Sequence, residues 1–495
     1  MLHTISPQDM REMERAFLDG TGYPSILLME HAAQAVIAAL AARVPKGSRV
    51  LFACGGGNNG GDGCAAARLW MGLGGQAEVW LLKNPLQLRG DAGVNAALLG
   101  ACGAALHVLY GDAPEIPADC EAVVDALYGT GLSRALDGAA LSAVRRINES
   151  GLPVIAVDIP SGVDGATGAV LGEAVRASET VTFHRPKHGH LLLPGRGMTG
   201  KLTVADIGIL PDWDGAQGYD VLEDADARAL LPARAMDAHK GSFGRVLSIA
   251  GSEGMAGAAC LCAGAALRAG AGLVTAACAF PVLGALQANV PCATARVVSD
   301  GAALSPDAEQ ELRSLAEKAS ALAIGPGLTA EEGVYQAIAP LMEGDLPKVI
   351  DADALNLLAR FGGSVGENTV LTPHPAEMAR LCGASVEEVL ASPVEMAQEL
   401  AANLGACVLL KGATTVIAQG EDAALNVTGT SAMATGGSGD VLTGVIAGLL
   451  AQGMTPFDAA RVGAFYHGRA GEAAEAALGA RAVTAADVLA HLRIE

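Results

Sequence analysis

The chain has 495 residues, a formal net charge of −21, 51% hydrophobic residues and only 3% aromatic residues. A chain of this length predicts roughly two to four domains. Its acidity argues against binding nucleic acid through the overall field, so any phosphate site must be local. The first 17 residues lack the apolar core of a signal peptide, and charged residues and glycines interrupt the most apolar stretch, 260–286, so we expect no membrane span.

The ten cysteines carry no C-x-x-C spacing typical of zinc or redox sites. We therefore expect them to be small core residues of a reduced protein, which predicts a cytoplasmic location. High alanine, glycine and valine content favours an α/β fold.

Short, nearly all-apolar runs recur along the chain and predict strands buried on both faces of parallel sheets. They are residues 49–53, 78–82, 122–125, 154–158, 244–250, 321–324, 348–350 and 408–410. Helical patterns separate them. Turn-forming residues and charges mark a break within 211–240, so we predict two α/β domains, residues 1–215 and 225–495.

A glycine-rich loop follows the first strand. Gly55, Gly57 and Gly60 match G-x-G-x-x-G, which is weak by itself because a glycine-rich tract satisfies many patterns. The helix that follows would point backbone N–H groups at an anion. The loop predicts a phosphate or dinucleotide site, and the alternative is a tight turn.

Two further strands of the first half end in aspartates, Asp125 and Asp158. Either could be a cap of a helix or turn, but two that face the same loop favour a site. Asn59, Asp125 and Ser161 offer only oxygen ligands, which suit a hard cation, and a single negative charge favours a monovalent ion. Asp158 is then a carboxylate free to handle protons.

The strings at 58–63, 124–131, 157–162 and 182–189 resemble the NAD(P)HX epimerase family over about residues 1–210. This resemblance implies a Rossmann-like three-layer sandwich that epimerises hydrated NADH or NADPH at C6 of the damaged nicotinamide ring. It implies Asp158 as the catalytic residue and K⁺ at Asn59, Asp125 and Ser161. Ala33 departs from the glycine expected there, at a position of helix packing. The implied substrate contacts are Asn58, Asn59, Gly60, Gly61, Asp62, Gly129, Thr130, Gly131, Leu132, Ser133, Arg134, Ala135 and Asp158.

A histidine-rich segment closes this half. His184, His188 and His190 suggest a metal site, but no carboxylate or cysteine completes the set. With Arg185 and Lys187 they favour a local basic patch near a substrate phosphate.

In the second half, the turn Thr435–Asp440 precedes an apolar run, 441–450, that predicts a buried helix. Such a turn forms an anion hole, and Asp440 beside it suits a base for a substrate hydroxyl. The alternative is a helix cap. Lys411 ends an apolar strand and suits nucleotide phosphates or, alternatively, is a solvated strand end. His374, between two prolines, suits a substrate contact, and residues 325–327 and 351–356 would complete the pocket rim.

The strings 240–244, 251–252, 257–258, 371–377 and 411–415, together with the glycine-rich turn, resemble the NAD(P)HX dehydratase branch of the ribokinase-like fold, over residues 225–495. The resemblance implies a ribokinase-like three-layer α/β domain in which a nucleotide phosphorylates the C6 hydroxyl and phosphate then leaves. Asp440 would be the base. The implied substrate contacts are Ala258, Gly327, His374 and Asp440. The implied nucleotide contacts are Lys411, Gly412, Ala413, Thr414, Thr415, Gly436, Gly437, Ser438 and Gly439.

The domain order resembles that of bacterial or archaeal members, so we expect ADP rather than ATP as co-substrate, together with Mg²⁺. The expected partners are hydrated NAD(P)H, an adenine nucleotide and further copies of the chain in a homo-oligomer. One alternative function is a ribokinase-like vitamin-precursor kinase with an N-terminal binding or dimerisation module. The strand-end residues Asn59, Asp125, Asp158 and Ser161 argue against such a module.

Overall fold

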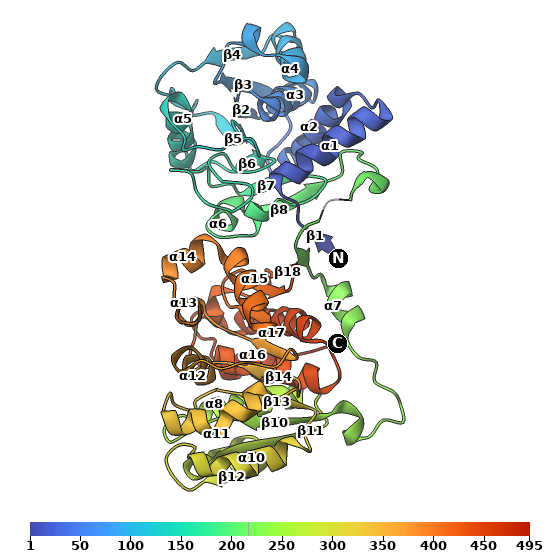
Figure 1. Ribbon diagram of the computed structural model, residues 1–495. Coiled ribbons are helices and arrows are strands. Elements are labelled where there is room, and N and C mark those ends of the chain that lie inside the picture. The colour runs from blue at the N-terminus through green and yellow to red at the C-terminus, as the bar shows by residue number, and fades with distance from the viewer. Residues whose placement is uncertain (216) are drawn as a thin grey trace. The chain divides into compact units, whose positions relative to one another are not determined.

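The computed structural model describes residues 1–215 and 217–495. The chain forms two compact units, one of His3–Tyr219 and one of Met1–Leu2 with Asp220–Glu495. Each unit is built on its own sheet (Figure 1). The ends of the first unit are held together, because Thr4 donates its N–H to the carbonyl of Tyr219 at 3.0 Å.

The N-terminal unit has a seven-stranded sheet in the order β4-β3-β2-β5-β6-β7-β8, with every neighbouring pair parallel. The strands are β2 (Arg49–Cys54), β3 (Gln76–Leu81), β4 (Ala105–Val108), β5 (Cys120–Ala126), β6 (Val154–Val157), β7 (Glu179–Phe183) and β8 (Lys201–Ala205). The helices are α1 (Pro7–Thr21), α2 (Ser25–Ala41), α3 (Asn58–Gly72), α4 (Gly90–Ala101), α5 (Gly138–Glu149) and α6 (Arg196–Thr199).

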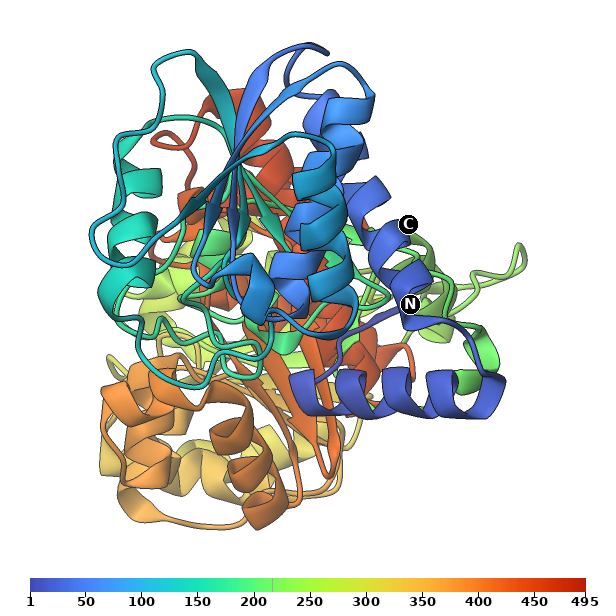
Figure 2. The same ribbon diagram turned by 90° about the horizontal axis from the view of Figure 1, so that it is seen from above.

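Helices cover both faces of this sheet. Alternate residues of β2 face opposite cores: Phe52 packs with α2 and α3, whereas Leu51 packs with α5. Figure 2 shows α5 on one side of the strands and α2, α3 and α4 on the other. The expected Rossmann-like three-layer sandwich is thereby confirmed. Ala33 is fully buried in α2, as expected of a packing position.

The C-terminal unit has an eleven-stranded sheet in the order β1-β9-β18-β17-β16-β15-β14-β13-β10-β11-β12. Strands β10 to β16 run parallel, and β17 and β18 form antiparallel pairs beside them. The strands are β1 (Leu2–His3), β9 (Asp220–Val221), β10 (Arg245–Ile249), β11 (Leu273–Ala279), β12 (Thr294–Ser299), β13 (Ala321–Ile324), β14 (Lys348–Ile350), β15 (Thr369–Leu371), β16 (Cys407–Leu410), β17 (Thr415–Gln419) and β18 (Asp422–Asn426).

Helices connect these strands. From β10 the chain moves outward to β12, then returns to the other side of β10 and continues through β13 to β16. Because parallel crossovers are right-handed, the helices of these two runs cover opposite faces. The helices are α7 (Asp224–Leu230), α8 (Ala256–Arg268), α9 (Leu283–Asn289), α10 (Glu309–Ala316), α11 (Glu332–Glu343), α12 (Asp353–Phe361), α13 (Pro375–Cys382), α14 (Val386–Ala391), α15 (Pro393–Leu404), α16 (Ser438–Ala451), α17 (Pro456–Leu478) and α18 (Ala485–His491).

Helix α16 is the buried helix that the sequence predicts, and every residue from Val441 to Ala451 is buried. It packs closely against α8 because Gly444 has no side chain. A Cβ at Gly444 would lie 2.1 Å from the carbonyl oxygen of Cys262. This close approach positions the start of α16 at the carboxyl edge of the sheet.

We expect Gly444→Ala to destabilise the C-terminal unit by roughly 1–3 kcal/mol, the usual cost of overpacking. All three tryptophans, Trp70, Trp80 and Trp213, lie in the N-terminal unit. Thermal unfolding should therefore show an earlier loss of helical circular dichroism with unchanged tryptophan fluorescence. Gly284→Ala, where nothing lies within 4 Å of the added Cβ, is the matched control. Equal stability of the two variants would contradict the packing argument.

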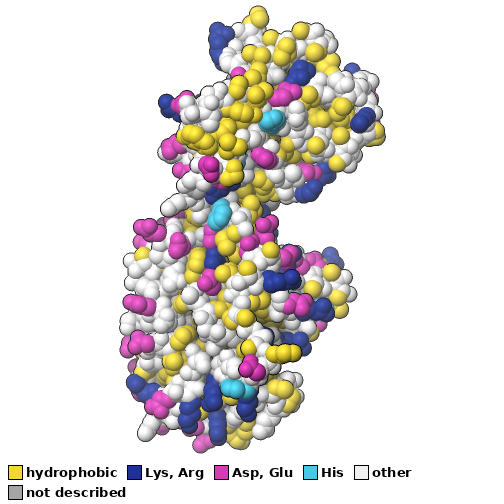
Figure 3. Space-filling model, turned by 90° about the vertical axis from the view of Figure 1, so that its right-hand side faces the viewer, with side chains coloured by type: hydrophobic (Ala, Val, Ile, Leu, Met, Phe, Trp, Pro, Cys, Tyr) yellow, Lys and Arg dark blue, Asp and Glu magenta, His cyan; other side chains and the backbone are white. Residues whose placement is uncertain are grey.

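The structure bears on two expectations from the sequence, the burial of the cysteines and the absence of a membrane span. All ten cysteines are free thiols, but Cys102, Cys292 and Cys382 are exposed, so the expectation that the cysteines are core residues is wrong for these three. Among the described residues, every helix is too short or too polar to cross a membrane. Figure 3 shows acidic side chains spread over the visible face of the C-terminal unit.

Candidate active sites

The N-terminal sheet has a topological switch point between β2 and β5, where the chain direction across the sheet reverses. The loops that leave these two strands diverge there and open a crevice. The cavity at this edge measures about 610 Å³. Its lining includes the predicted residues Asn58, Asn59, Asp62, Gly129, Thr130, Gly131 and Asp158.

The other six predicted contacts lie in the same two segments of the chain but outside the cavity lining. Gly60 and Gly61 are buried inside α3. Ser133, Arg134 and Ala135 are exposed and Leu132 is half-buried, and none of the four belongs to the cavity lining. The cavity lining also includes charged residues that were not predicted to contact substrate, namely Arg11, Glu14, Lys83 and Asp91. Arg11 and Glu14 come from the amphipathic helix α1, where no strand-end pattern could mark them, whereas Lys83 follows the end of β3 and could have been found by that signal.

The glycines of the first loop allow close approaches between backbone segments. A Cβ at Gly55 would lie 1.8 Å from the carbonyl oxygen of Leu127, and one at Gly60 would lie 2.0 Å from that of Gly55. Helix α3 begins with Gly57 as N-cap and has no side-chain cap. Its first N–H groups therefore remain available to an anion in the crevice.

Two of the three predicted cation ligands, Asp125 and Ser161, are in direct contact. Asp125 is fully buried and accepts hydrogen bonds from the backbone N–H and the hydroxyl of Ser161, at 2.8 and 2.7 Å. Burial raises the pKa of Asp125 to about 6, against the opposing effect of these hydrogen bonds. Both side-chain amide atoms of Asn59 are buried without a hydrogen-bond partner. An orphaned buried amide oxygen is a group that a bound cation would satisfy.

Asp158, which was expected to handle protons, has a hydrogen-bond partner on each of its carboxylate oxygens. Its Oδ1 lies 2.9 Å from Lys187 Nζ, and its Oδ2 accepts the N–H of Thr130 at 3.3 Å. Burial raises the pKa of Asp158, but the adjacent Lys187 ammonium more than offsets this, so the pKa lies below its ordinary value. The backbone at Asp158 has φ +64°, a conformation rare for side chains other than glycine.

The predicted basic patch is wrong, because four of its five members are internal. Arg185, Lys187, His188 and His190 are all at least 90% buried. Arg185 pairs with Asp214 at 2.8 Å, and the ring of His188 stacks on Tyr219 with centroids 4.2 Å apart. No group of metal-ligating side chains occurs among the described residues. The segment is a scaffold beneath the cavity, and only Lys187 reaches the cavity lining.

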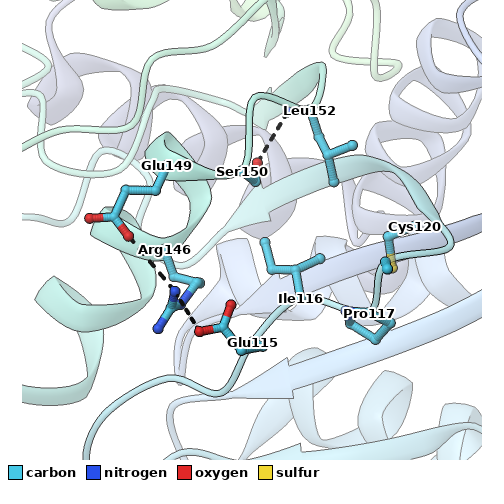
Figure 4. Close-up of a pocket in the computed structure, with 9 residues that line it drawn as sticks. Glu115, Ile116, Pro117, Cys120, Arg146, Glu149, Ser150 and Leu152 are labelled. Carbon is cyan, nitrogen blue, oxygen red and sulfur yellow. Dashed lines mark hydrogen bonds and ion pairs between the residues drawn. The ribbon is translucent and has the colours of Figure 1, made fainter.

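A second, smaller cavity of about 190 Å³ lies near the amino-terminal end of β5, the opposite edge from the site (Figure 4). Its one cation, Arg146, is paired with Glu115 at 2.8 Å and lies 3.8 Å from Glu149. Cys120 at its wall has a pKa raised to about 11 by burial, so the thiol is unreactive at neutral pH. This cavity offers no catalytic set.

The C-terminal sheet has its own switch point, between β10 and β13. Ser252 after β10 donates its hydroxyl to the carbonyl of Gly327 after β13, at 2.8 Å. A Cβ at Gly327 would lie 3.0 Å from that of Ala258. Two of the predicted dinucleotide contacts, Ala258 and Gly327, are therefore neighbours at the crevice.

Asp440 occupies the first turn of α16, whose N-cap is Gly437 at φ +91°. The helix has no side-chain cap, which rules out the alternative that Asp440 serves as its cap. Burial raises the pKa of Asp440 to about 7, and the negative charge of Asp351 adds to this, while Lys411 lowers it. A carboxylate with a pKa near neutrality is well matched to general-base catalysis.

Lys411 is not a solvated strand end. Its Nζ lies 2.8 Å from Asp351 Oδ1 and 3.8 Å from Glu377 Oε2. Asp351 also accepts the hydroxyl of Thr443 on α16 at 2.7 Å. A Cβ at Gly439 would lie 3.4 Å from Lys411 Nζ, so the lysine reaches the glycine-rich turn. Lys411 thereby links β14, α13 and α16.

The remaining predicted contacts surround this centre. Residues Gly412–Thr415 form the turn into β17, with Gly412 and Ala413 exposed. His374 is the N-cap of α13, and its Nδ1 accepts the N–H groups of Ala376 and Glu377. Sequence reasoning missed His467 on α17, which is buried with its Nε2 3.4 Å from the hydroxyl of Ser438 in the turn.

Each of the two α/β units carries a cluster of polar residues at the carboxyl edge of its parallel strands, where α/β enzymes bind their ligands. The chain therefore has the architecture of an enzyme with one site in each unit. In the N-terminal unit the carboxylate of Asp158 lines a cavity of about 610 Å³, and in the C-terminal unit the carboxylate of Asp440 lies at a glycine-rich helix start. Residues 25–189 match the family described as YjeF-related protein N-terminus, and residues 246–493 match NAD(P)H-hydrate dehydratase. The chain belongs to the family of bifunctional NAD(P)H-hydrate repair enzymes.

Relatives of that description cover nearly the whole chain. The enzyme of Moorella thermoacetica is 40% identical over 99% of this chain and 96% of its own length. That of Escherichia coli is 36% identical over 99% of this chain and 93% of its own length. These matches confirm the family that the sequence motifs predict.

Solved structures match the C-terminal unit. The ADP/ATP-dependent NAD(P)H-hydrate dehydratase of Bacillus subtilis, co-crystallised with ATP and Mg²⁺, is 35% identical with a TM-score of 0.50, covering 56% of this chain and 97% of that one. A ribokinase-like protein of Enterococcus faecalis is 28% identical with the same TM-score of 0.50, over 55% of this chain and 94% of that one. The ribokinase-like prediction is confirmed.

Proposed function

We propose that this chain repairs hydrated NADH and NADPH in two steps. Residues 1–215 interconvert the R and S epimers, and residues 225–495 dehydrate the S epimer at the cost of an adenine nucleotide. One observation above all supports this: Asp440, with a pKa of about 7, stands at an uncapped, glycine-rich helix start that Lys411 approaches.

In the dehydratase, Asp440 accepts the proton of the C6 hydroxyl. The hydroxyl oxygen attacks the terminal phosphorus of the nucleotide at the same time, and the P–O bond to the leaving nucleotide breaks. The C6–O bond then breaks and phosphate departs with its electron pair. The N1 lone pair supports the cation, and loss of a proton from C5 restores the ring double bond. Phosphate is a far better leaving group than hydroxide, which is why a kinase-like site suits this dehydration.

The residues assigned to the nucleotide are Lys411 to Thr415 and Gly436 to Gly439, and those assigned to the dinucleotide are Ala258, Gly327 and His374. Their common position at one sheet edge supports the assignment. Mg²⁺ would screen the phosphate charge and enter with the nucleotide. We propose ADP as the preferred co-substrate, because the order of the two domains resembles that of bacterial and archaeal members. We also propose that the enzyme is cytoplasmic, since its substrates are cytoplasmic metabolites. We propose further that it forms a homo-oligomer.

In the epimerase, Asp158 takes the C6 hydroxyl proton as the C6–N1 bond opens and N1 keeps the electron pair. C6 becomes a planar carbonyl carbon. Attack by N1 on its other face, with return of the proton, gives the other epimer. Asn58 to Asp62 and Gly129 to Ala135 are the proposed substrate-binding segments.

We propose that K⁺ binds Asn59, Asp125 and Ser161, supported by the unpartnered amide of Asn59. The ion would supply a fixed positive charge beneath the substrate loop. Asn59→Leu should raise the K⁺ concentration that half-saturates epimerisation by roughly 10–100-fold, the scale typical of lost support at metal sites. Titration with KCl at constant ionic strength measures this, with NaCl as the control salt, and an unchanged half-saturation would exclude Asn59 as a ligand.

The coupled assay that tests the whole proposal supplies separated epimers of hydrated NADPH with ADP or ATP and follows the nicotinamide absorbance. Recovery from the S epimer should require a nucleotide, and the R epimer should recover after a lag. The rival function, a kinase whose product stays phosphorylated, predicts nucleotide consumption without recovered absorbance.

A further inference from the structure

Lys187 is buried at the wall of the epimerase cavity, and all three N–H groups of its ammonium donate to protein acceptors. The side chain is 1% exposed. Its Nζ donates to Asp158 Oδ1 at 2.9 Å, to Thr182 Oγ1 at 3.0 Å and to the carbonyl of Phe183 at 3.1 Å. An ammonium group has three N–H donors. With all three directed to protein acceptors, Lys187 is poorly placed to act as an acid towards substrate.

Thr182 closes a triangle with this pair. Its hydroxyl accepts from Lys187 and donates to Asp158 Oδ1 at 3.1 Å. Oδ1 therefore receives two side-chain donors. Oδ2 receives the Thr130 N–H at a longer 3.3 Å and faces Gly129, a residue of the cavity lining. The two carboxylate oxygens thus differ: Oδ1 is anchored and Oδ2 is open to the cavity.

His190 fixes the backbone on which this triangle stands. Its Nδ1 accepts the N–H of Lys187 at 2.9 Å, so its Nε2 must carry the proton that it shares with the carbonyl of Asp158 at 2.7 Å. Burial lowers the pKa of His190 to about 4, which keeps the ring neutral. One histidine thereby ties the two partners of the ion pair together through their main chains.

We propose that Lys187 and Thr182 are positioning residues of the epimerase, which hold Asp158 as a carboxylate through Oδ1 and leave Oδ2 as the single oxygen that exchanges protons with substrate. This inference rests on the proposed epimerase function. The other titratable groups that face Lys187 are Glu14 on α1 and His190, and Asp62 on α3 faces Asp158. Burial raises the pKa of Glu14 and raises that of Asp62 well above its ordinary value, so Lys187 compensates Asp158 most directly.

The test is the pH profile of epimerisation in Lys187→Met. A base must be ionised, so the wild-type rate should fall only when pH drops below the depressed pKa of Asp158. Without the ammonium, burial is opposed only by the remaining hydrogen bonds and weaker charges, and the acid limb should move to higher pH by roughly 1–3 units, the usual effect of a close opposite charge. Activity should return towards the wild-type level on the alkaline side.

Two controls separate this from simple damage. Dehydration of the S epimer by the same chain should stay at the wild-type rate, and fluorescence of the three tryptophans reports the fold of the mutated unit. Lys83→Met removes another lysine of the same cavity lining that forms no ion pair with a described residue. This variant should change KM alone, with the acid limb in place.

A second variant keeps the inference testable if Lys187→Met fails to fold. Thr182→Val removes one donor from Oδ1, so it should shift the acid limb in the same direction by a smaller amount. An acid limb at the wild-type pH in a folded Lys187→Met or Thr182→Val variant would overturn the inference. Absence of epimerisation in the wild-type chain would instead contradict the proposed function.

Discussion

Asp440→Asn is expected to lower kcat of dehydration by about 10²–10⁴-fold, the usual contribution of a positioned general base. The amide keeps the size of the side chain but cannot accept the hydroxyl proton. In the wild type, the rate should rise with pH through the pKa of Asp440, about 7, because only the ionised carboxylate is a base. Initial rates with the S epimer and saturating nucleotide measure both effects.

Asp353→Asn is the companion variant. Asp353 contributes to the raised pKa of Asp440 by charge, and its own carboxylate accepts the N–H of Thr329 at 3.0 Å. Its replacement should move the pH profile of dehydration to lower pH while most of the rate at high pH remains. If Asp440→Asn dehydrated the S epimer normally, Asp440 would be excluded as the base.

Asp158→Asn is expected to lower the rate of epimer interconversion by a similar factor of about 10²–10⁴ and leave dehydration untouched. Given a mixture of epimers and a nucleotide, the variant should consume the S form and leave the R form, which chromatography resolves. The reason is that the amide neither carries the charge that pairs with Lys187 nor accepts a proton.

Asp164→Asn is its control from the same loop, since Asp164 Oδ1 serves its own turn by accepting the N–H groups of Ala166 and Thr167. That variant should interconvert the epimers at the wild-type rate. Normal interconversion in Asp158→Asn would remove Asp158 from the mechanism and leave the pair with Lys187 a structural feature.

The strands that the sequence predicts best are short runs made up mainly of apolar residues. Residues 321–324 and 348–350 coincide with β13 and β14. Strand β7 was missed because Glu179, Thr180 and Thr182 break its apolar pattern, although all five of its residues are buried. Glu179 is tolerated there because Arg43 pairs with it at 2.8 Å, a partner 136 residues away. Strand β11 was missed within an alanine-rich stretch that also suits a helix.

The residues of the candidate sites also fall into those that the sequence could predict and those that it could not. Residues that follow strands, such as Asp125, Asp158 and Lys411, could be found because parallel strands end at one edge. What sequence could not supply was their partners. Lys187 looks like part of a basic patch until the fold buries it against Asp158, and Asp440 acquires its pKa of about 7 from burial and from Asp351.

The unit His3–Tyr219 begins and ends at one point, because the N–H of Thr4 donates to the carbonyl of Tyr219 and the N–H of Tyr219 donates to the hydroxyl of Thr4, each at 3.0 Å. A unit whose ends touch can be inserted into another chain, removed from it or circularly permuted without stretching its backbone. The N-terminal unit therefore meets the geometric condition for insertion into a chain or transfer between chains as a whole.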